Sequence, residues 1–326
     1  MRSSQQLPPH RCDHSSAHPP LPSHLPPHVS SPLTHQQQLT FPHRWQAHTL
    51  PYYGPTLGDA CSGLWPLPRS YNCSGDLTPN KKPETSGSIG MDEDHFQFVA
   101  DNPAAKGSAR LKRAFDRFHG HIFNPLRPHP QLSTPQPQLA PAEGAPLFTL
   151  DVELGSANET LGLGDDESYS LSIETTVGWG SIGRLSAPTI WGALHGLESF
   201  SQLTTRTVGK TGSVTINSAY IFIDDVPRFP WRGIMIDTSR HWHPLASIRS
   251  MIDGISFNRM NVLHWHITDM QSFPLKTKSY PKLADGAYGG AGSALHYDAD
   301  DVKAIVAYAK DRGVRVVPEI DTPVST

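Results

Sequence analysis

Carboxylates, imidazoles and one arginine stand at three places between residues 237 and 321, each at the end of a short apolar run or inside it. The residues are Asp237, Ser239, Arg240, His241, His264, His266, Asp269, Glu319 and Asp321. No glycine-rich phosphate loop follows any of the three runs, which argues against a nucleotide site. Side chains that both donate and accept hydrogen bonds suit a polar substrate with many hydroxyl groups when they converge on one place.

The three apolar runs, at 233–237, 261–267 and 314–321, are predicted as buried parallel strands because each is too short for a helix. A helix between consecutive strands makes a right-handed βαβαβ unit. Such a unit begins either a doubly wound sheet or a (β/α)8 barrel, and in both the chemistry lies at the carboxyl ends of the strands. The polar residues are therefore expected to converge on one edge of the sheet.

Two helices are predicted between these strands from apolar residues spaced three or four apart. Their apolar faces comprise Leu245, Ile248, Met251, Ile252 and Ile255 in the first helix and Val302, Ile305, Val306 and Ala309 in the second. Asp298 can cap the second helix and Gly313 can end it. Trp265 is expected to face these helices and lie in the core, because side chains alternate along a strand.

Residues 64–226 are predicted to form a separate α+β domain in front of this unit. The expected elements are helices at 108–118 and 189–203, one-sided strands at 148–154 and 169–174, a hairpin-like pair at 213–223 and a Pro/Gln-rich surface loop at 125–146. The first helix carries Arg110, Lys112, Arg113 and Arg117, which are interpreted as its solvated outer face.

The first 63 residues are crowded with Pro, His, Ser and Gln and poor in aliphatic residues, so they are predicted to be disordered. No secretory signal pattern, a basic start followed by ~7–15 apolar residues, occurs in the first 30 positions. No stretch reaches the ~20 apolar residues of a membrane span. Cys61 and Cys73 can pair in an oxidising compartment or stay free. A formal net charge of −3 gives no reason to expect a nucleic-acid partner.

The run Arg232-Gly-Ile-Met-Ile-Asp-Thr-Ser-Arg-His241, with the segments 261–269 and 271–274, resembles the first two barrel strands of the β-N-acetylhexosaminidases, glycoside hydrolase family 20. Residues 319–323 resemble the third strand of that family. Upstream motifs at 64–70, 165–171 and 192–203 extend the resemblance over most of residues 64–323. It implies a structural α+β domain at 64–226, followed at 227–326 by about three of the eight strands of a (β/α)8 TIM barrel.

The resemblance implies an exo-acting enzyme that releases terminal non-reducing N-acetylhexosamine from glycans or glycoconjugates, without a cofactor or metal. In that family the substrate's own 2-acetamido group attacks the anomeric carbon with overall retention, an aspartate orients that group, and the adjacent glutamate protonates the leaving oxygen. By resemblance Arg240 grips the sugar. The supporting site wall comprises Asp237, His264, His266, Asp269, Glu319 and Asp321. A vacuolar, lysosomal or secreted location is implied, and a homodimer is left open for the full-length protein.

In that family the Asp-Glu pair follows the fourth strand, whereas this sequence stops after the third. Where the family continues Asp-Thr-Pro-Gly-His, this sequence has Val324 and Ser325 after Pro323. The sequence is therefore interpreted as an inactive fragment or an incomplete gene model, and no turnover is expected from it. The strand at 314–320 would be an exposed edge without a neighbour and is predicted to promote aggregation.

Two other functions stay open. His264 and His266 could be ligands in a zinc-dependent TIM-barrel hydrolase, which predicts stoichiometric zinc in purified protein. A non-catalytic interaction module would instead use the 64–226 domain and its basic helix, and it predicts a stable fragment that binds a partner.

Overall fold

The computed structural model describes residues 60–73, 88–124, 146–176, 180–206, 212–293 and 295–322. The disorder predicted for residues 1–63 falls almost wholly outside these ranges, as does most of the loop predicted at 125–146. None of the helices in the described ranges is long and apolar enough to cross a membrane. Cys61, in the 3₁₀ helix η1 (Ala60–Gly63), forms a disulfide with Cys73, so these two thiols pair.

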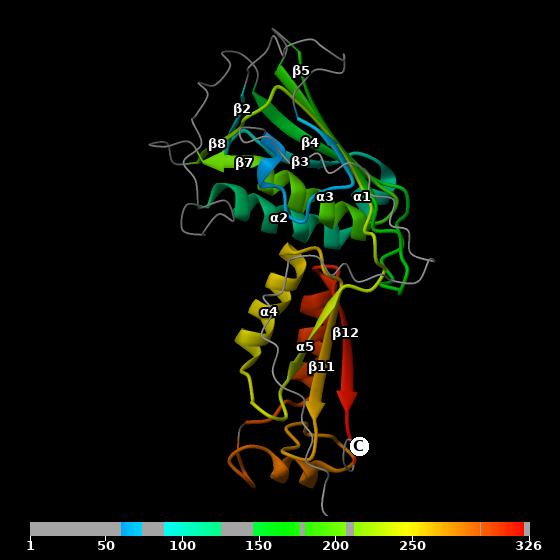
Figure 1. The fold of residues 1–326 in the computed structure, drawn as a ribbon, viewed down its shortest axis with the longest axis vertical. Coiled ribbons are helices and arrows are strands. Elements are labelled where there is room, and N and C mark those ends of the chain that lie inside the picture. Colours follow the sequence, from blue (N-terminus) through cyan, green and yellow to red (C-terminus); the bar gives the residue numbers. More distant parts are fainter. Residues whose placement is uncertain are drawn as a thin grey trace, which may run out of the picture. The chain divides into compact units, whose positions relative to one another are not determined.

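A six-stranded sheet organises the first half of the described chain (Figure 1). In spatial order its strands are β1 (Ser70–Asn72), β9 (Tyr220–Asp225), β5 (Tyr169–Thr176), β6 (Gly180–Ala187), β4 (Leu147–Leu154) and β3 (Gln97–Ala100). Strand β4 runs parallel to β3 and β6, and the remaining pairs are antiparallel. Leu150, Val152 and Leu154 of β4 are buried while the residues between them are not, so the expected one-sided strand is confirmed.

A second sheet consists of three antiparallel strands, β2 (Ile89–Asp92), β8 (Ser213–Ile216) and β7 (Thr204–Arg206). The hairpin predicted at 213–223 is wrong, because β8 belongs to this sheet whereas β9 belongs to the six-stranded one. Both strands alternate apolar and polar residues as the strands of a hairpin do. Strand β8 instead pairs with β7, which precedes it closely, and with the distant β2, whereas β9 pairs with β1 and β5.

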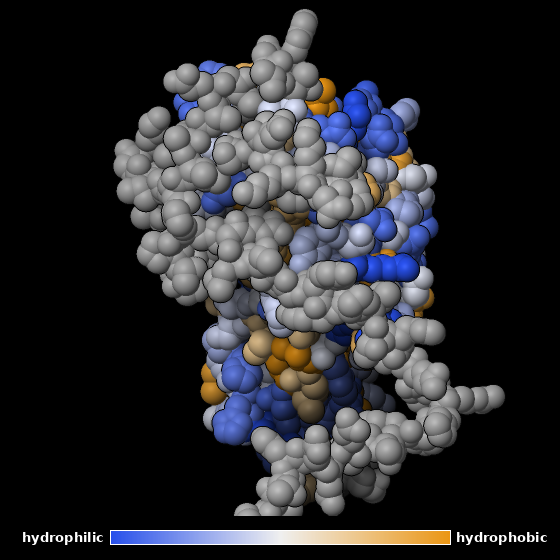
Figure 2. All heavy atoms as spheres, turned by 45° about the horizontal axis from the view of Figure 1, so that its top comes forward, coloured by the Kyte–Doolittle hydropathy of each residue, from blue (hydrophilic) through white to orange (hydrophobic). Residues whose placement is uncertain are grey.

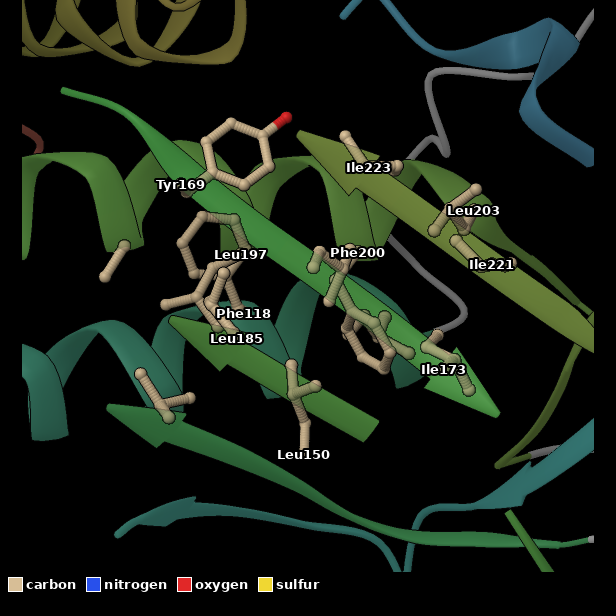
Figure 3. Close-up of a cluster of buried hydrophobic side chains, with 14 of the residues drawn as sticks. Phe118, Leu150, Tyr169, Ile173, Leu185, Leu197, Phe200, Leu203, Ile221 and Ile223 are labelled. Carbon is tan, nitrogen blue, oxygen red and sulfur yellow. The ribbon is translucent and has the colours of Figure 1, made fainter. Parts of the chain in front are cut away.

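Helix α3 (Ile190–Leu203) packs on the six-stranded sheet and is buried over its whole length. Figure 3 shows Leu197 and Phe200 of this helix among Tyr169, Ile173 and Leu185 of the sheet. Two glycines of the helix permit this close approach. A Cβ added at Gly192 would lie 2.0 Å from a backbone carbonyl oxygen, and one at Gly196 would lie 2.2 Å from a leucine methyl carbon.

Helix α2 (Ala109–Phe123) follows the short helix α1 (Pro103–Gly107) and extends beyond the predicted end at residue 118. The interpretation of its basic residues as a solvated face is wrong for Arg110, which is buried and forms ion pairs with Glu159 and Asp311. Arg113 also pairs with Asp311, at 2.8 Å. The helical pattern alone could not reveal an acidic partner so far along the chain.

The predicted βαβαβ unit forms the second half of the described chain (Figure 1). It consists of β10 (Gly233–Asp237), α4 (Leu245–Phe257), β11 (Val262–Thr268), α5 (Ala299–Lys310) and β12 (Arg315–Ile320), with the 3₁₀ helix η2 (Pro281–Gly286) in the loop before α5. The strands are parallel, in the order β10-β11-β12. Asp298 caps α5 in a capping box with Asp301, and Gly313 ends the segment with φ of +73°, as the sequence predicts.

The buried stripes of the two helices are narrower than predicted. Ile248, Ile252 and Ile255 of α4 and Ile305 and Ala309 of α5 are buried, whereas Met251 and Val306 are exposed. Each of these two residues is three positions away from a buried residue of its helix. A step of three residues is less than a full helical turn, so such a side chain can lie beside the buried face and not on it.

The described residues form no closed barrel, since β10 and β12 each pair with β11 alone. Met235 of β10 and Ile320 of β12 are exposed, and Figure 2 shows a hydrophobic patch bordered by hydrophilic residues on one face of the molecule. The edge strand predicted at 314–320 is therefore present. Its effect on aggregation stays a prediction.

Buried charged contacts join the two halves of the described chain. Arg259 donates to Asp225 at 2.8 Å and to Ser199 at 2.6 Å, and Arg232 donates to Glu167. Burial alone would raise the pKa of Glu167, but His195, Arg232 and Asn261 outweigh it and lower the pKa to about 2.

Candidate functional site

The carboxyl ends of the three parallel strands bring the predicted polar residues together. Asp237 of β10 lies opposite His266 of β11, which lies opposite Glu319 of β12. His264 stands one pleat earlier on β11, and Asp269 directly follows that strand. The three groups that are separate in the sequence thus form one polar row at one edge of the sheet.

One carboxylate oxygen of Glu319 contacts both imidazoles. Its Oε2 lies 2.7 Å from Nε2 of His264 and 2.9 Å from Nδ1 of His266, because residues two apart on a strand point to the same side. The hydrogen bond from His266 lowers the pKa of Glu319, which burial opposes and the bond from His264 reinforces. Burial disfavours the charged form of His266, but Glu319, Asp237 and Asp269 together raise its pKa.

Asp269 is held from several directions where β11 ends. Its Oδ2 lies 3.4 Å from Nε2 of His266 and 3.9 Å from Nη2 of Arg240, and its Oδ1 accepts a 2.7 Å hydrogen bond from the backbone N–H of Met270. Of the two histidines, His266 contacts Asp269 and His264 contacts Glu319.

Arg240 stands in the turn that follows β10, with 58% of its side chain exposed. Its Nη1 lies 3.2 Å from Oδ2 of Asp237, but this ion pair is not aligned as a hydrogen bond, since that carboxylate oxygen has no hydrogen-bond partner. Among the described residues, no group accepts a hydrogen bond from the guanidinium of Arg240. The charge thus lies near two carboxylates on a side chain that is more than half exposed, and its N–H groups can donate to a ligand.

Three side chains of the row could together hold a metal ion, and they differ from the pair that the sequence suggested. The atoms of His266, Asp269 and Asp321 that could ligate an ion all lie within 4.8 Å of one another. His264 does not belong to this group, because its ring faces the carboxylate of β12. The nearby guanidinium of Arg240 adds a positive charge that opposes a cation at this place.

Residues outside the predicted site wall also shape the site. Thr238 accepts a 3.0 Å hydrogen bond from Nε1 of Trp265, whose side chain is fully buried as predicted. Ser239 stands in the turn that carries Arg240 and donates to the carbonyl oxygen of Ser272, and Tyr288 donates to the carbonyl oxygen of Arg240. Isolated serines and tyrosines in loops carry no periodic signal. For Thr238, the position next to Asp237 is the one clue that the sequence offers.

Two family models match the chain. The model "Glycosyl hydrolase family 20, catalytic domain" matches residues 229–325, and the model "beta-acetyl hexosaminidase like" matches residues 64–203. Both matches overlap the region 64–323, over which the sequence motifs resemble the β-N-acetylhexosaminidases.

Curated relatives share these regions. Beta-hexosaminidase 1 of Arabidopsis thaliana is 38% identical over 271 residues, which cover 82% of this chain and 47% of the relative. The human Beta-hexosaminidase subunit beta is 37% identical over 264 residues, which cover 80% of this chain and 43% of the relative. The chain thus spans slightly less than half the length of these relatives.

A solved structure has the same fold. The chitobiase of Flavobacterium johnsoniae matches with a TM-score of 0.60 and 28% identity, over 80% of this chain and 35% of the chitobiase. This match confirms the predicted fold class, a mixed α/β chain in which a partial (β/α)8 barrel follows an α+β domain. It also agrees with the family named from the sequence motifs.

Proposed function

Because this chain belongs to glycoside hydrolase family 20, we propose that it supplies the sugar-gripping part of an exo-β-N-acetylhexosaminidase. Its substrates are glycans or glycoconjugates that end in a non-reducing N-acetylhexosamine. The bond that breaks is the β-glycosidic bond of that terminal sugar. The chain contributes the groups that hold the sugar while the bond is cleaved with retention.

The observation that supports this proposal is the exposure and the surroundings of the Arg240 guanidinium. Its guanidinium is exposed, lies between the carboxylates of Asp237 and Asp269, and donates no hydrogen bond within the described part of the chain. A planar guanidinium can donate two parallel hydrogen bonds to neighbouring sugar hydroxyls. The two carboxylates keep the fork at one place, so less rotamer freedom is lost when the sugar binds.

The other members of the row support the site and do not supply the acid. A general acid at near-neutral pH needs a raised pKa, whereas the contacts with the histidines lower the pKa of Glu319. Glu319 therefore stays ionised and orients His264 and His266, and His266 in turn orients Asp269. Asp321 completes the wall beyond β12.

The test compares the affinity of the purified wild-type chain for N-acetylglucosamine with that of the variant Arg240→Lys. Both affinities are measured by NMR titration. A charge-assisted hydrogen bond contributes on the order of 1.5–3 kcal/mol, so loss of the fork should weaken binding about tenfold or more. Arg249→Lys is the matched control, because Arg249 is exposed on α4, outside the polar row. Equal affinity of the Arg240 variant and the wild type, or no binding by either, would count against the proposal.

Two finer statements belong to the same proposal. The division into a structural domain at 64–226 and a barrel segment from residue 227 follows the sequence motifs, and limited proteolysis can test it. A homodimer of the full-length protein stays a prediction that light scattering can test.

A further inference from the structure

We infer that Tyr288 is a positioning residue for Arg240, and that the loop from Asp269 to Tyr297 braces the turn on which Arg240 stands. This inference rests on the proposed function, since it concerns the arginine that would grip the sugar. The argument starts from the backbone of the turn between β10 and α4.

The N-terminal side of Arg240 is fixed by β10. Oδ1 of Asp237 accepts a 3.0 Å hydrogen bond from the N–H of Ser239 and a 2.9 Å hydrogen bond from the N–H of Arg240. An aspartate that caps the next residues in this way fixes the start of a turn. It leaves the carbonyl side of Arg240 to be fixed by another element.

Two contacts tie the ends of the turn to the loop that follows β11. At the start, the hydroxyls of Ser239 and Ser272 each donate a 2.9 Å hydrogen bond to the backbone carbonyl oxygen of the other residue, and both serines are buried. At the end, the hydroxyl of Tyr297 accepts from the N–H of His243 at 3.2 Å and donates to its carbonyl oxygen at 2.5 Å. Trp242 stacks on the ring of Tyr297, with centroids 6.0 Å apart.

Tyr288 holds the middle of the turn, because its hydroxyl donates to the carbonyl oxygen of Arg240. The two backbone groups of Arg240 are thus fixed from opposite sides, the N–H by Asp237 and the carbonyl by Tyr288. With the backbone fixed, the guanidinium is confined to the few rotamers that reach the carboxylates of Asp237 and Asp269.

The loop itself is built to present Tyr288. Gly289 and Gly290 have φ of +89° and +74°, which other residues rarely adopt. The hydroxyl of Ser293 donates a 2.6 Å hydrogen bond to the carbonyl oxygen of Tyr288, and a Cβ at Gly289 would lie 2.7 Å from that hydroxyl oxygen. The backbone on the C-terminal side of Tyr288 is therefore held in a conformation that these small residues permit.

The experiment compares Tyr288→Phe with Tyr280→Phe in the purified 326-residue chain. Each variant loses one hydroxyl and keeps the ring. Tyr280 is the matched control because it lies in the same loop, is 71% exposed, and its hydroxyl has no hydrogen-bond partner among the described residues. A folded-state check by circular dichroism accompanies both variants.

The first measurement needs no sugar. Phenylglyoxal modifies accessible guanidinium groups, and mass spectrometry reports the rate at Arg240 relative to that at Arg249 in the same sample. A freed turn should let Arg240 leave its carboxylates, so we expect this ratio to rise about three- to tenfold in Tyr288→Phe and to stay unchanged in Tyr280→Phe. These factors correspond to the loss of one hydrogen bond. An unchanged ratio in Tyr288→Phe would overturn the inference.

The second measurement is the Kd for N-acetylglucosamine, which we expect to rise about three- to tenfold in Tyr288→Phe. A faster modification of Arg240 together with weaker sugar binding supports both the inference and the proposed function. A faster modification with no sugar binding by the wild type supports the positioning role and refutes the proposed function. An unchanged Kd, with wild-type binding measured, refutes the link between Tyr288 and the sugar.

Discussion

The pH dependence of stability should be governed in large part by one buried carboxyl group, that of Glu198. This residue is on the buried face of α3, is 4% exposed, and accepts a 2.9 Å hydrogen bond from Gln202. It lines a small cavity together with residues of α2, of α4 and of the turn after α5, the charged ones being Arg117, Asp253 and Arg312. Burial raises the pKa of Glu198 to about 7, although Gln202, Arg259 and Arg117 oppose the shift.

The sign and the size of the effect follow from that shift. The group is protonated in the folded state but ionised in the unfolded state between its ordinary pKa of 4.5 and about 7. The stability it contributes is fully present below pH 4.5 and is lost as pH rises towards about 7. This difference in pKa between the unfolded and the folded state lowers the free energy of unfolding by about 3 kcal/mol once the pH has passed about 7.

The variant Glu198→Gln removes the titration and keeps a carbonyl oxygen that can accept from Gln202. At pH 4.5 the variant and the wild type should melt at nearly the same temperature, since the side chain at position 198 is neutral in both folded states and the unfolded wild type has only begun to ionise. At pH 8 the variant should melt on the order of 6–12 °C higher, because only the wild type buries a charge. Calorimetry or circular dichroism at several pH values from 4.5 to 8 measures the difference.

Other titrating groups near Glu198 do not disturb this comparison. His195, which also lines the cavity, has a pKa lowered by burial, so its contribution to stability rises with pH, opposite in sign to that of Glu198. Both the variant and the wild type contain His195, so its contribution cancels in the difference between their melting temperatures. Glu153→Gln, on an exposed position of β4, should leave the profile unchanged. Parallel melting profiles of wild type and Glu198→Gln would refute the reasoning.

Two further outcomes test the packing and the site. Gly192→Ala places a Cβ 2.0 Å from the carbonyl oxygen of Ser168 and should lower the free energy of unfolding by about 1–3 kcal/mol or more. The control Gly254→Ala, whose Cβ has nothing within 4 Å, should be neutral or stabilising by up to ~1 kcal/mol. Similar losses of stability for both variants in denaturant titrations would contradict this reasoning. Purified protein should hold far less than one equivalent of zinc by atomic emission, because His264 and His266 contact the same carboxylate. Stoichiometric zinc would support the zinc-hydrolase hypothesis.

The βαβαβ unit was predictable because its signals are local and agree with one another. The cap at Asp298, the glycine stop at Gly313 and the spacing of Ile248, Ile252 and Ile255 each act within a few residues, and each is found as predicted. When propensity, capping and burial all favour the same element, tertiary contacts have little left to decide.

The first half was less predictable because its strands pair with distant partners. Strand β9 lies between β1 and β5, and β8 lies between β2 and β7, although the two strands are adjacent in sequence. Strand β6, which reads Gly-Ser-Ile-Gly-Arg-Leu-Ser-Ala, has a weak strand signal and was missed. Arg110 likewise found a partner in Asp311, which no pattern within α2 could reveal.

In the site, the period of the strand predicts which side chains share a side, but it does not predict which atoms meet. That His264 and His266 reach one oxygen of Glu319 is a matter of register between β11 and β12. Tyr288 is farther from prediction still, since it contacts Arg240 through a loop whose course depends on glycines with positive φ.

The contacts that hold Arg240 have a consequence for how the protein can be studied. These contacts come from two segments of this chain, which follow its first two parallel strands. The residues are Asp237, Ser239, Asp269, Ser272 and Tyr288. The contacts that position Arg240 therefore come from within this chain, and the proposed grip on a sugar can be tested by binding alone. If Arg240 grips the sugar as proposed, the purified chain should bind N-acetylglucosamine, and Arg240→Lys should weaken that binding whether or not hydrolysis is measured.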